Sequence, residues 1–329
     1  MTIPPDYQIN PKILKLIAQI DSQKFFIESL KIPLPIREKI QRVSLLKSSL
    51  FSARIEGNQL TMENMQEAPD EKQKNEIFNI LHAAQYIEKN ITGGQIITTQ
   101  TITDIHKLVM NNITDQAGYF RREMGAIFNQ EGTVVYFSPP PEKINPFITQ
   151  LLTYINSDME QFPLIKALVT HIVFEKIHPF IDGNGRVGRL LIYAVLQSQG
   201  YDLGLFIPFE EYLENHKSDY YFHLDVGLKQ TNDYLLFMLE SYLHQLLKIK
   251  ETMLAELRSD GAVLLPPRQE EIFNTIKDHR LVSFDFIRRR FLKVPERTLR
   301  YDLKRLAESN FIIKIGKTRG SYYRIKLGN

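Results

Sequence analysis

The sequence predicts a mainly helical protein that ends in a small module of mixed helix and strand. Three observations support this fold class. Apolar residues recur at helical spacing in most segments between residues 12 and 258. One pair of β-rich runs interrupts these segments near residue 130. After a linker at residues 259–267, three short helical patterns precede a second pair of β-rich runs.

Length and composition limit the class of protein. The 329 residues allow two or three domains, and the 43% hydrophobic content is enough for their cores. The absence of cysteine excludes disulfides, thiol nucleophiles and thiolate metal sites. Residues 1–10 contain two prolines and an aspartate, and no later stretch is apolar for the length that a bilayer requires. We therefore expect a soluble, cytoplasmic protein without a membrane partner.

Charge is distributed unevenly along the chain. Residues 262–329 hold 16 Lys and Arg against 7 Asp and Glu, a net charge of +9, whereas residues 1–261 hold 25 against 31, a net charge of −6. A basic module of this kind favours an anionic partner, either nucleic acid or an acidic protein surface.

A series of helices is expected before residue 113. Residues 12–30 and 36–56 carry apolar stripes, and Gly57 ends the second helix. Thr61 begins a capping pattern for a short helix. Longer helices are expected at residues 73–90 and 99–112.

The middle of the chain changes from helical to β character. The runs Met124–Phe128 and Thr133–Phe137 flank turn residues, which is typical of a β-hairpin. Ser138 and three prolines then prevent the second strand from continuing. Further helices are expected at residues 143–160, 164–177, 187–196, 211–227 and 231–258.

Residues 178–189, His-Pro-Phe-Ile-Asp-Gly-Asn-Gly-Arg-Val-Gly-Arg, begin with a candidate base. His178 is expected at a helix end, because Pro179 disfavours a helical predecessor. His171, Glu175 and His178 at i, i+4 and i+7 offer the alternative of a transition-metal site. The helix breaks at Pro179 and no further ligand set is evident, so packing roles are expected for His171 and Glu175.

The rest of this stretch suits an anion. Gly183 and Gly185 permit a tight path that points N–H groups inward at the N-terminus of the next helix. Arg186 and Arg189 lie three apart and can grip phosphate oxygens together. Asp182 offers a hard oxygen ligand for magnesium.

The stretch matches the signature of the Fic family, H-P-F-x-[D/E]-G-N-G-R-x-x-R, at every defined position. The resemblance implies a mostly helical core, residues 97–258, that transfers AMP from ATP to a Ser, Thr or Tyr hydroxyl of a target protein. It also implies that His178 is the base and that Asp182 holds Mg²⁺. The implied nucleotide-binding residues in this stretch are Gly183, Asn184, Gly185, Arg186, Val187, Gly188 and Arg189.

The segment Ser52–Gly57 resembles the Fic inhibitory motif, [S/T]-x-x-x-E-[G/N]. Because the motif precedes the core, the resemblance implies the subclass in which the N-terminal region, residues 1–96, supplies the inhibitory glutamate. That glutamate would be Glu56. A plain helix cap with a solvated glutamate is the alternative.

Two further features resemble parts of Fic proteins. The hairpin occupies the place of a flap that holds the target by strand addition, which implies contacts from Ile127, Val134, Val135 and Tyr136. Tyr220 and Tyr221 resemble a tyrosine pair near the adenine and ribose. An aromatic pair in a helix is also a common core element.

Residues 268–329 resemble a winged helix, with helices expected at 268–279, 283–292 and 296–309 and a ribbon at 311–315 and 322–325. In that fold the third helix can enter the major groove of DNA. The candidate contacts are Arg297, Thr298, Arg300 and Lys304 on the helix and Lys317 and Arg319 on the wing.

The sequence leaves alternatives open. The same site could remove AMP from a modified protein, with Glu56 positioning water. A different class is a DNA-binding regulator with a nucleotide-sensing core. The target, the oligomeric state and the choice between DNA and protein as partner of the basic module are not fixed by the sequence.

Overall fold

The computed structural model describes residues 1–30, 32–65, 70–128, 134–201, 206–258, 265–309, 311–316 and 321–326. The chain divides into two compact units. One comprises Met1–Lys31 and Lys39–Thr252, and the other comprises Ile32–Glu38 and Met253–Asn329. Within the described parts, no helix combines the length and the apolar character needed to cross a membrane.

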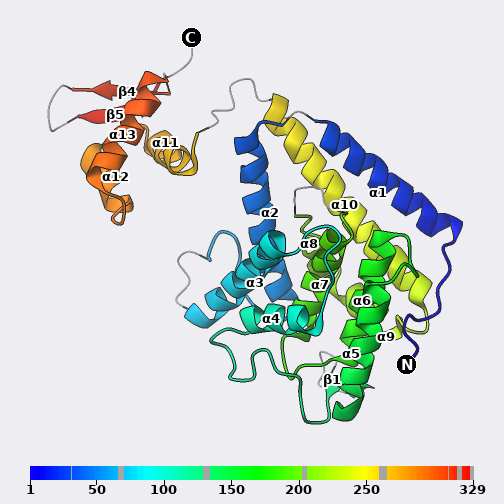
Figure 1. The fold of residues 1–329 in the computed structure, drawn as a ribbon. Helices are drawn as coiled ribbons and strands as arrows, with labels where there is room; N and C mark the ends of the chain where they lie inside the picture. The colour runs from blue at the N-terminus through cyan, green and yellow to red at the C-terminus, as the bar shows by residue number, and fades with distance from the viewer. Residues whose placement is uncertain are drawn as a thin grey trace. The chain divides into compact units, whose positions relative to one another are not determined.

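Helices form most of the chain up to residue 258 (Figure 1). Their bounds are α1 (Pro11–Ser29), α2 (Leu34–Ile55), α3 (Glu71–Asn90), α4 (Thr99–Val109), α5 (Pro141–Ile155), α6 (Pro163–Ile177), α7 (Asn184–Ser198), α8 (Glu210–Asn215), α9 (Lys217–Val226) and α10 (Thr231–Arg258). Side-chain caps fix several starts: Asn10 begins α1, Asp70 begins α3, and Thr98 forms a capping box at α4.

The core of the larger unit is the pair of helices α6 and α7, joined by the loop at residues 178–183. Residues 164–177 of α6 are all buried. A helix buried on every side must be apolar all round, and the few polar residues of α6 therefore need partners inside the protein. Helices α3 and α4 pack on α7, and α5 packs on α6. The loop between α6 and α7 is thus held by the most buried part of the fold.

The predicted hairpin is confirmed. Strands β1 (Ala126–Phe128) and β2 (Val134–Phe137) pair antiparallel, with Ala126 opposite Phe137 and Ile127 opposite Tyr136. The register shifts after Ile127, where the ladder has a bulge or irregularity.

Some expected helices have different limits. Residues 62–65 form a turn rather than the short helix expected after Thr61; the Thr61 N–H donates to Asn64 Oδ1 at 2.7 Å, which closes a local turn instead. The single helix expected at residues 211–227 is two helices, α8 and α9, because His216 departs from helical angles at φ −121° and ψ 42°. Helices α4 and α5 end at residues 109 and 155, earlier than expected.

The smaller unit contains α11 (Pro267–His279), α12 (Phe284–Arg290) and α13 (Glu296–Glu308). Its sheet has the order β3-β5-β4, with β3 (Val282–Ser283), β4 (Ile312–Ile315) and β5 (Tyr322–Ile325) antiparallel. The three helices and the ribbon were predicted, whereas the two-residue strand β3 is too short for a sequence pattern. The buried core includes Ile272, Leu299, Leu303 and Ile312. The assignment to the winged-helix fold stays a prediction, as do the predicted domain boundaries.

Candidate active site

His178 is held at the end of α6 in an unusual backbone conformation. Its angles are left-handed, φ 49° and ψ 59°, while its N–H still donates to Phe174 O at 2.9 Å. Nδ1 lies 3.2 Å from Glu175 O. That contact places the hydrogen on Nδ1 and leaves the lone pair on Nε2. Burial lowers the pKa of His178, so the ring is neutral and its Nε2 can accept a proton at neutral pH.

Asn184 closes the loop that follows His178. Its Oδ1 accepts from Phe180 N at 2.9 Å, and its Nδ2 donates to Phe180 O at 2.9 Å. Gly183 adopts φ +80°, and a Cβ there would lie 2.7 Å from Met110 Sδ. Asn184 therefore shapes the loop with both ends of its amide. Its predicted contact with nucleotide stays a prediction.

His106 on α4 supports the same loop through hydrogen bonds and a stacking contact. Its Nδ1 accepts from Gly118 N at 2.8 Å, and its Nε2 lies 3.0 Å from Asp182 O. The ring stacks on Phe180 with centroids 3.6 Å apart. Burial lowers the pKa of His106 to about 4, so the neutral ring donates from Nε2. No sequence pattern indicates this role of His106, because its hydrogen-bond partners are backbone atoms of Gly118 and Asp182.

Asp182 lies at the rim of this loop with a partly exposed carboxylate, whose side chain is 62% exposed. Its Oδ1 accepts from Arg186 Nη2 at 2.8 Å and from Gly183 N at 2.5 Å. Magnesium in nucleotide sites is commonly held by one or two carboxylates together with phosphate oxygens and water. A single exposed carboxylate beside an anion site fits that mode of binding.

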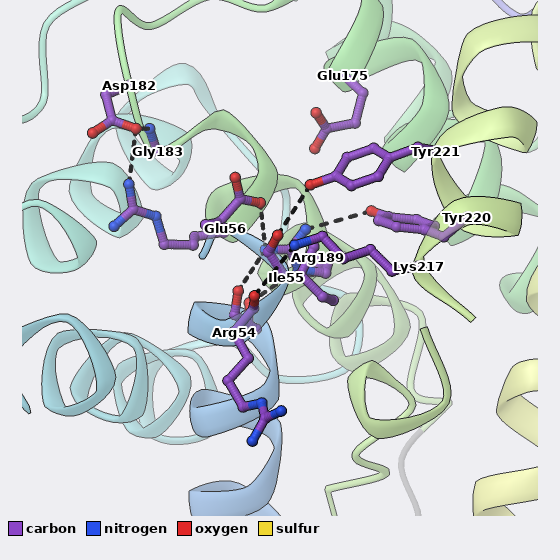
Figure 2. Close-up of polar contacts among 12 residues, drawn as sticks. Arg54, Ile55, Glu56, Glu175, Asp182, Gly183, Arg189, Lys217, Tyr220 and Tyr221 are labelled. Carbon is purple, nitrogen blue, oxygen red and sulfur yellow. Dashed lines mark hydrogen bonds and ion pairs between the residues drawn. The ribbon is translucent and has the colours of Figure 1, made fainter. Parts of the chain in front are cut away.

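Arg189, on the second turn of α7, is the most enclosed charge of the site, with a side chain only 1% exposed. Nε donates to Ser52 Oγ at 3.0 Å, and Nη2 donates to Ser52 O at 2.9 Å and to Glu56 Oε1 at 2.8 Å. These partners lie at the end of α2 and just beyond it, about 130 residues away in sequence. Figure 2 shows Glu56 and Tyr220 approaching Arg189 from different sides.

The glycines of α7 create room for acidic side chains. A Cβ on Gly185 would collide with Glu56 Oε1 and would lie 3.1 Å from Arg189 Nη1. The Glu56 carboxylate therefore sits against the first turn of α7, where helix N–H groups lack partners within the helix and favour an anion. A Cβ on Gly188 would instead collide with Glu175 Oε1, which indicates close packing of α6 on α7.

Val187 and Gly188 thus face the interior. Val187 is fully buried. Their predicted nucleotide contacts remain predictions.

The two tyrosines of α9 have different environments. Tyr220 is fully buried, and its hydroxyl lies 3.5 Å from Arg189 Nη1. Tyr221 is 37% exposed, and its hydroxyl donates to Ile55 O, the last carbonyl of α2, at 3.1 Å (Figure 2). Tyr221 has surface left for a ligand, whereas Tyr220 can act only through its neighbours.

Arg121 ties the hairpin to His178, a role that the sequence analysis missed. Nε donates to His178 O at 2.8 Å, Nη1 to Glu123 O at 2.7 Å and Nη2 to Pro139 O at 2.6 Å. Arg121 N also donates to Pro179 O at 2.9 Å. One buried guanidinium therefore joins both ends of the hairpin to the residue that follows α6.

The hairpin residues singled out by the sequence are on paired strands. Tyr136 of β2 lies under Lys176, with Nζ 4.4 Å from the ring centroid. The side chains of Ile127, Val134 and Val135 fall outside the described part of the structure. Their contact with a target stays a prediction.

The alternative of a transition-metal site gains no support. Within the described residues, no group of three His, Cys, Asp or Glu side chains could hold a metal ion. Both nitrogens of His171 contact tyrosine hydroxyls, Tyr234 at 2.6 Å and Tyr220 at 3.1 Å. Glu175 is buried, and burial raises its pKa to about 8.

The predicted DNA contacts that the structure describes lie on α13. Arg297, Arg300 and Lys304 are exposed, and Thr298 is half-buried. Lys317 and Arg319 lie outside the described residues. The described positions belong to the smaller unit, whereas His178 belongs to the larger one.

Comparisons with known proteins agree with this geometry. Residues 96–196 match the family model described as Fic/DOC family. The chain is 26% identical over 223 residues to "Protein adenylyltransferase Fic" of Drosophila willistoni, covering 64% of this chain and 42% of that protein. It is 29% identical over 188 residues to the protein of the same name from Drosophila mojavensis, covering 54% of this chain and 35% of that protein. The chain thus spans less than half the length of these relatives.

Solved structures share the fold. A Fic family protein from Desulfovibrio desulfuricans has a TM-score of 0.70 at 22% identity, with 99% of each chain covered. Fic-1 of C. elegans has a TM-score of 0.61 at 18% identity, covering 75% of this chain and 74% of that chain. At these identities the likeness concerns the fold alone.

Proposed function

We propose, from the premise that this chain belongs to the Fic family, that it is a protein adenylyltransferase restrained by its own Glu56. The reaction is transfer of AMP from ATP to a Ser, Thr or Tyr hydroxyl of a target protein. The names of the curated relatives support the reaction class.

The proposal rests on a place for an anion at the start of α7. We call this place, formed by Gly185 and Arg189, the anion seat. The Glu56 carboxylate lies against Gly185 and 2.8 Å from Arg189 Nη2. A place that accommodates a carboxylate between helix N–H groups and a guanidinium is suited to phosphate oxygens as well. The β- and γ-phosphates of ATP would take this seat, with Arg186 and Arg189 on their oxygens.

His178 supplies the base for the transfer. Its Nε2 removes the proton from the target hydroxyl as the oxygen attacks the α-phosphorus. The bond between the α-phosphorus and the oxygen bridging to the β-phosphate breaks, and pyrophosphate leaves with its charge on the seat. Asp182 would hold Mg²⁺, which neutralises phosphate charge when bound.

The hairpin would hold the target. Strand addition along β1–β2 would present a hydroxyl to His178, because Arg121 joins the ends of the hairpin to the His178 carbonyl. The target is therefore expected to offer an extended segment.

Glu56 would hold the enzyme inactive by occupying the seat and by pairing with Arg189. ATP could then bind only with its terminal phosphates misaligned. A charge-assisted hydrogen bond contributes about 1.5–3 kcal/mol, and each 1.4 kcal/mol corresponds to roughly tenfold in rate. Removal of the carboxylate should therefore raise transfer by about one or two orders of magnitude.

The test is labelling with ATP and magnesium, measured per enzyme molecule. Glu56→Gly should label itself or a protein substrate much faster than the parent, and Glu56→Gly/Arg189→Ala should not. Glu56→Gly/His178→Ala should label about a hundredfold to ten-thousandfold more slowly than Glu56→Gly. If Glu56→Gly labels no faster than the parent, Ser52–Gly57 is a plain helix cap without an inhibitory role. If removal of AMP is the native direction, Glu56→Gly should instead abolish that hydrolysis.

A second candidate function concerns the smaller unit, which we propose binds duplex DNA. Exposed cations gather on α12, on α13 and between them: Arg288, Arg289, Arg290, Lys293, Arg297, Arg300, Lys304 and Arg305. Ion pairs with Glu296 and Glu308 compensate Arg300 and Lys304 only in part. DNA affinity of the full chain should fall steeply with salt and be weakened by Arg297→Ala. Salt-independent binding, or none, would favour an acidic protein partner.

A further inference from the structure

Behind Arg189, three buried side chains form a continuous line of contacts into the core. The Tyr220 hydroxyl lies 3.5 Å from Arg189 Nη1 and 3.1 Å from His171 Nε2. His171 Nδ1 lies 2.6 Å from the Tyr234 hydroxyl, which also donates to Leu168 O at 3.2 Å. The three rings are fully buried. The line therefore connects Arg189 on α7 with the Leu168 carbonyl on α6.

The hydrogen positions along this line have one consistent arrangement. Arg189 can only donate, so the Tyr220 oxygen accepts and its own proton goes to His171 Nε2. Nδ1 then carries the histidine hydrogen and donates to Tyr234, whose proton goes to Leu168 O. His171 is neutral, because burial and the charge of Arg189 lower its pKa to about 3.

The other contacts of Arg189 come from the inhibitory segment. Ser52 and Glu56 hold Nε and Nη2, and the Glu56 carboxylate is the contact that occupies the place proposed for phosphate. Tyr220 belongs to α9 and contacts Nη1. The 3.5 Å separation leaves the guanidinium room to move towards Tyr220 once the pull of Glu56 is gone.

We propose that Tyr220 is a positioning residue that, held by His171 and Tyr234, keeps Arg189 aimed at the γ-phosphate once Glu56 no longer pairs with it. This inference rests on the proposed function, since it assigns Arg189 to the terminal phosphate. Glu175 Oε1 lies 3.7 Å from His171 Nε2, beyond hydrogen-bond distance, so Glu175 is not a hydrogen-bonded member of this line.

The first experiment compares ATP and ADP binding, because ADP lacks the phosphate that Arg189 would contact. In full-length Glu56→Gly, the added change Tyr220→Phe should weaken ATP binding about tenfold, the effect of one hydrogen bond to a charged group, and leave ADP binding unchanged. Calorimetry with each nucleotide and magnesium measures this. Equal losses for ATP and ADP would overturn the proposal.

Two matched variants separate positioning from general damage. With Arg189→Ala already present, Tyr220→Phe should cause no further loss of ATP affinity, and a further tenfold loss would contradict the proposal. Tyr154→Phe removes another buried hydroxyl, one on α5 that contacts Tyr7 at 3.3 Å. It should leave the preference for ATP over ADP as in the parent.

Nuclear magnetic resonance of histidine-labelled protein gives a readout that does not depend on activity. His171 should show the Nδ1–H tautomer, and Tyr220→Phe should shift its Nε2 signal. A proton on Nε2 would overturn the line as drawn, because the Tyr220 proton would then have no acceptor within it. If Glu56→Gly binds ATP but labels nothing, the proposed transfer fails, and the ATP and ADP comparison still decides the role of Tyr220.

Discussion

Arg54 and Glu214 are joined by two hydrogen bonds to one carboxylate oxygen, 3.1 Å from Arg54 Nε and 2.9 Å from Nη2. This pair ties the last turn of α2 to α8. Lys217 Nζ lies 3.5 Å from Arg54 O, and the Tyr221 hydroxyl donates to Ile55 O at 3.1 Å (Figure 2). The segment that carries Glu56 is therefore held by α8 and α9 independently of Arg189.

Loosening that attachment should activate the enzyme while leaving Glu56 in place. Glu214→Gln removes the charge from a pair whose side chains are 30% and 17% exposed, so the expected gain in transfer is modest, about two- to fivefold. The rate of labelling with ATP measures it. Glu28→Gln, which breaks the Lys24–Glu28 pair on α1, should change nothing. A gain that persists in a Glu56→Gly background would contradict release of Glu56 as the cause.

The pH dependence of kcat/KM should follow the titration of His178. Burial lowers the pKa of His178, so the ring stays neutral to a lower pH than an ordinary histidine. In Glu56→Gly, kcat/KM should therefore hold steady as pH falls to about 6.5, the ordinary histidine value, and decline only below it. A decline that begins above that value would argue against a buried histidine as the group that titrates.

Magnesium dependence should be sensitive to Asp182. Asp182→Asn keeps the shape of the side chain but removes its charge, and should shift the half-maximal magnesium concentration upward by about tenfold or more. Titration of labelling against magnesium, repeated for ATP binding, checks this. Superimposable titrations would remove Asp182 from the metal site. Arg186 pairs with the same carboxylate at 2.8 Å, so Arg186→Ala alone should not abolish magnesium binding.

Glu175 should make stability depend on pH. Its pKa is raised by burial to about 8 from an ordinary 4.5, so the folded protein favours the protonated carboxyl. The stabilisation is complete below the ordinary value and is lost as pH rises through 8. Glu175→Gln cannot titrate, so its melting temperature relative to the parent should rise from pH 5 to pH 9. A constant difference over this range would show that Glu175 is charged in the folded protein.

The sequence predicted most of the helices because apolar residues recur along them at helical spacing, as in α3 and α10. It failed where local geometry decides, as at His216, whose backbone angles separate α8 from α9. In the site, His178, Asp182 and the glycines could be found because one short stretch carries them. Glu56 could be found because the motif Ser52–Gly57 carries it, and in the structure it pairs with Arg189 at 2.8 Å.

His106 and Arg121 could not be found in the same way. Both act on main-chain oxygens, Asp182 O for the histidine and His178 O for the arginine. A carbonyl is present at every residue, so such contacts leave no pattern in the side chains of the partner segment. Only the folded chain identifies them, and the same holds for the environment of Tyr220.

Arg121 holds the two ends of the hairpin together. The sequence of the hairpin and the geometry at His178 therefore need not constrain each other. Its guanidinium fixes Glu123 and Pro139, on either side of the strands, to the His178 carbonyl. The residues between these anchors can therefore diverge, lengthen or be exchanged with those of another protein while the alignment at the base is kept. Under the proposed function, choice of protein substrate and the phosphate chemistry can accordingly evolve, or be engineered, one at a time.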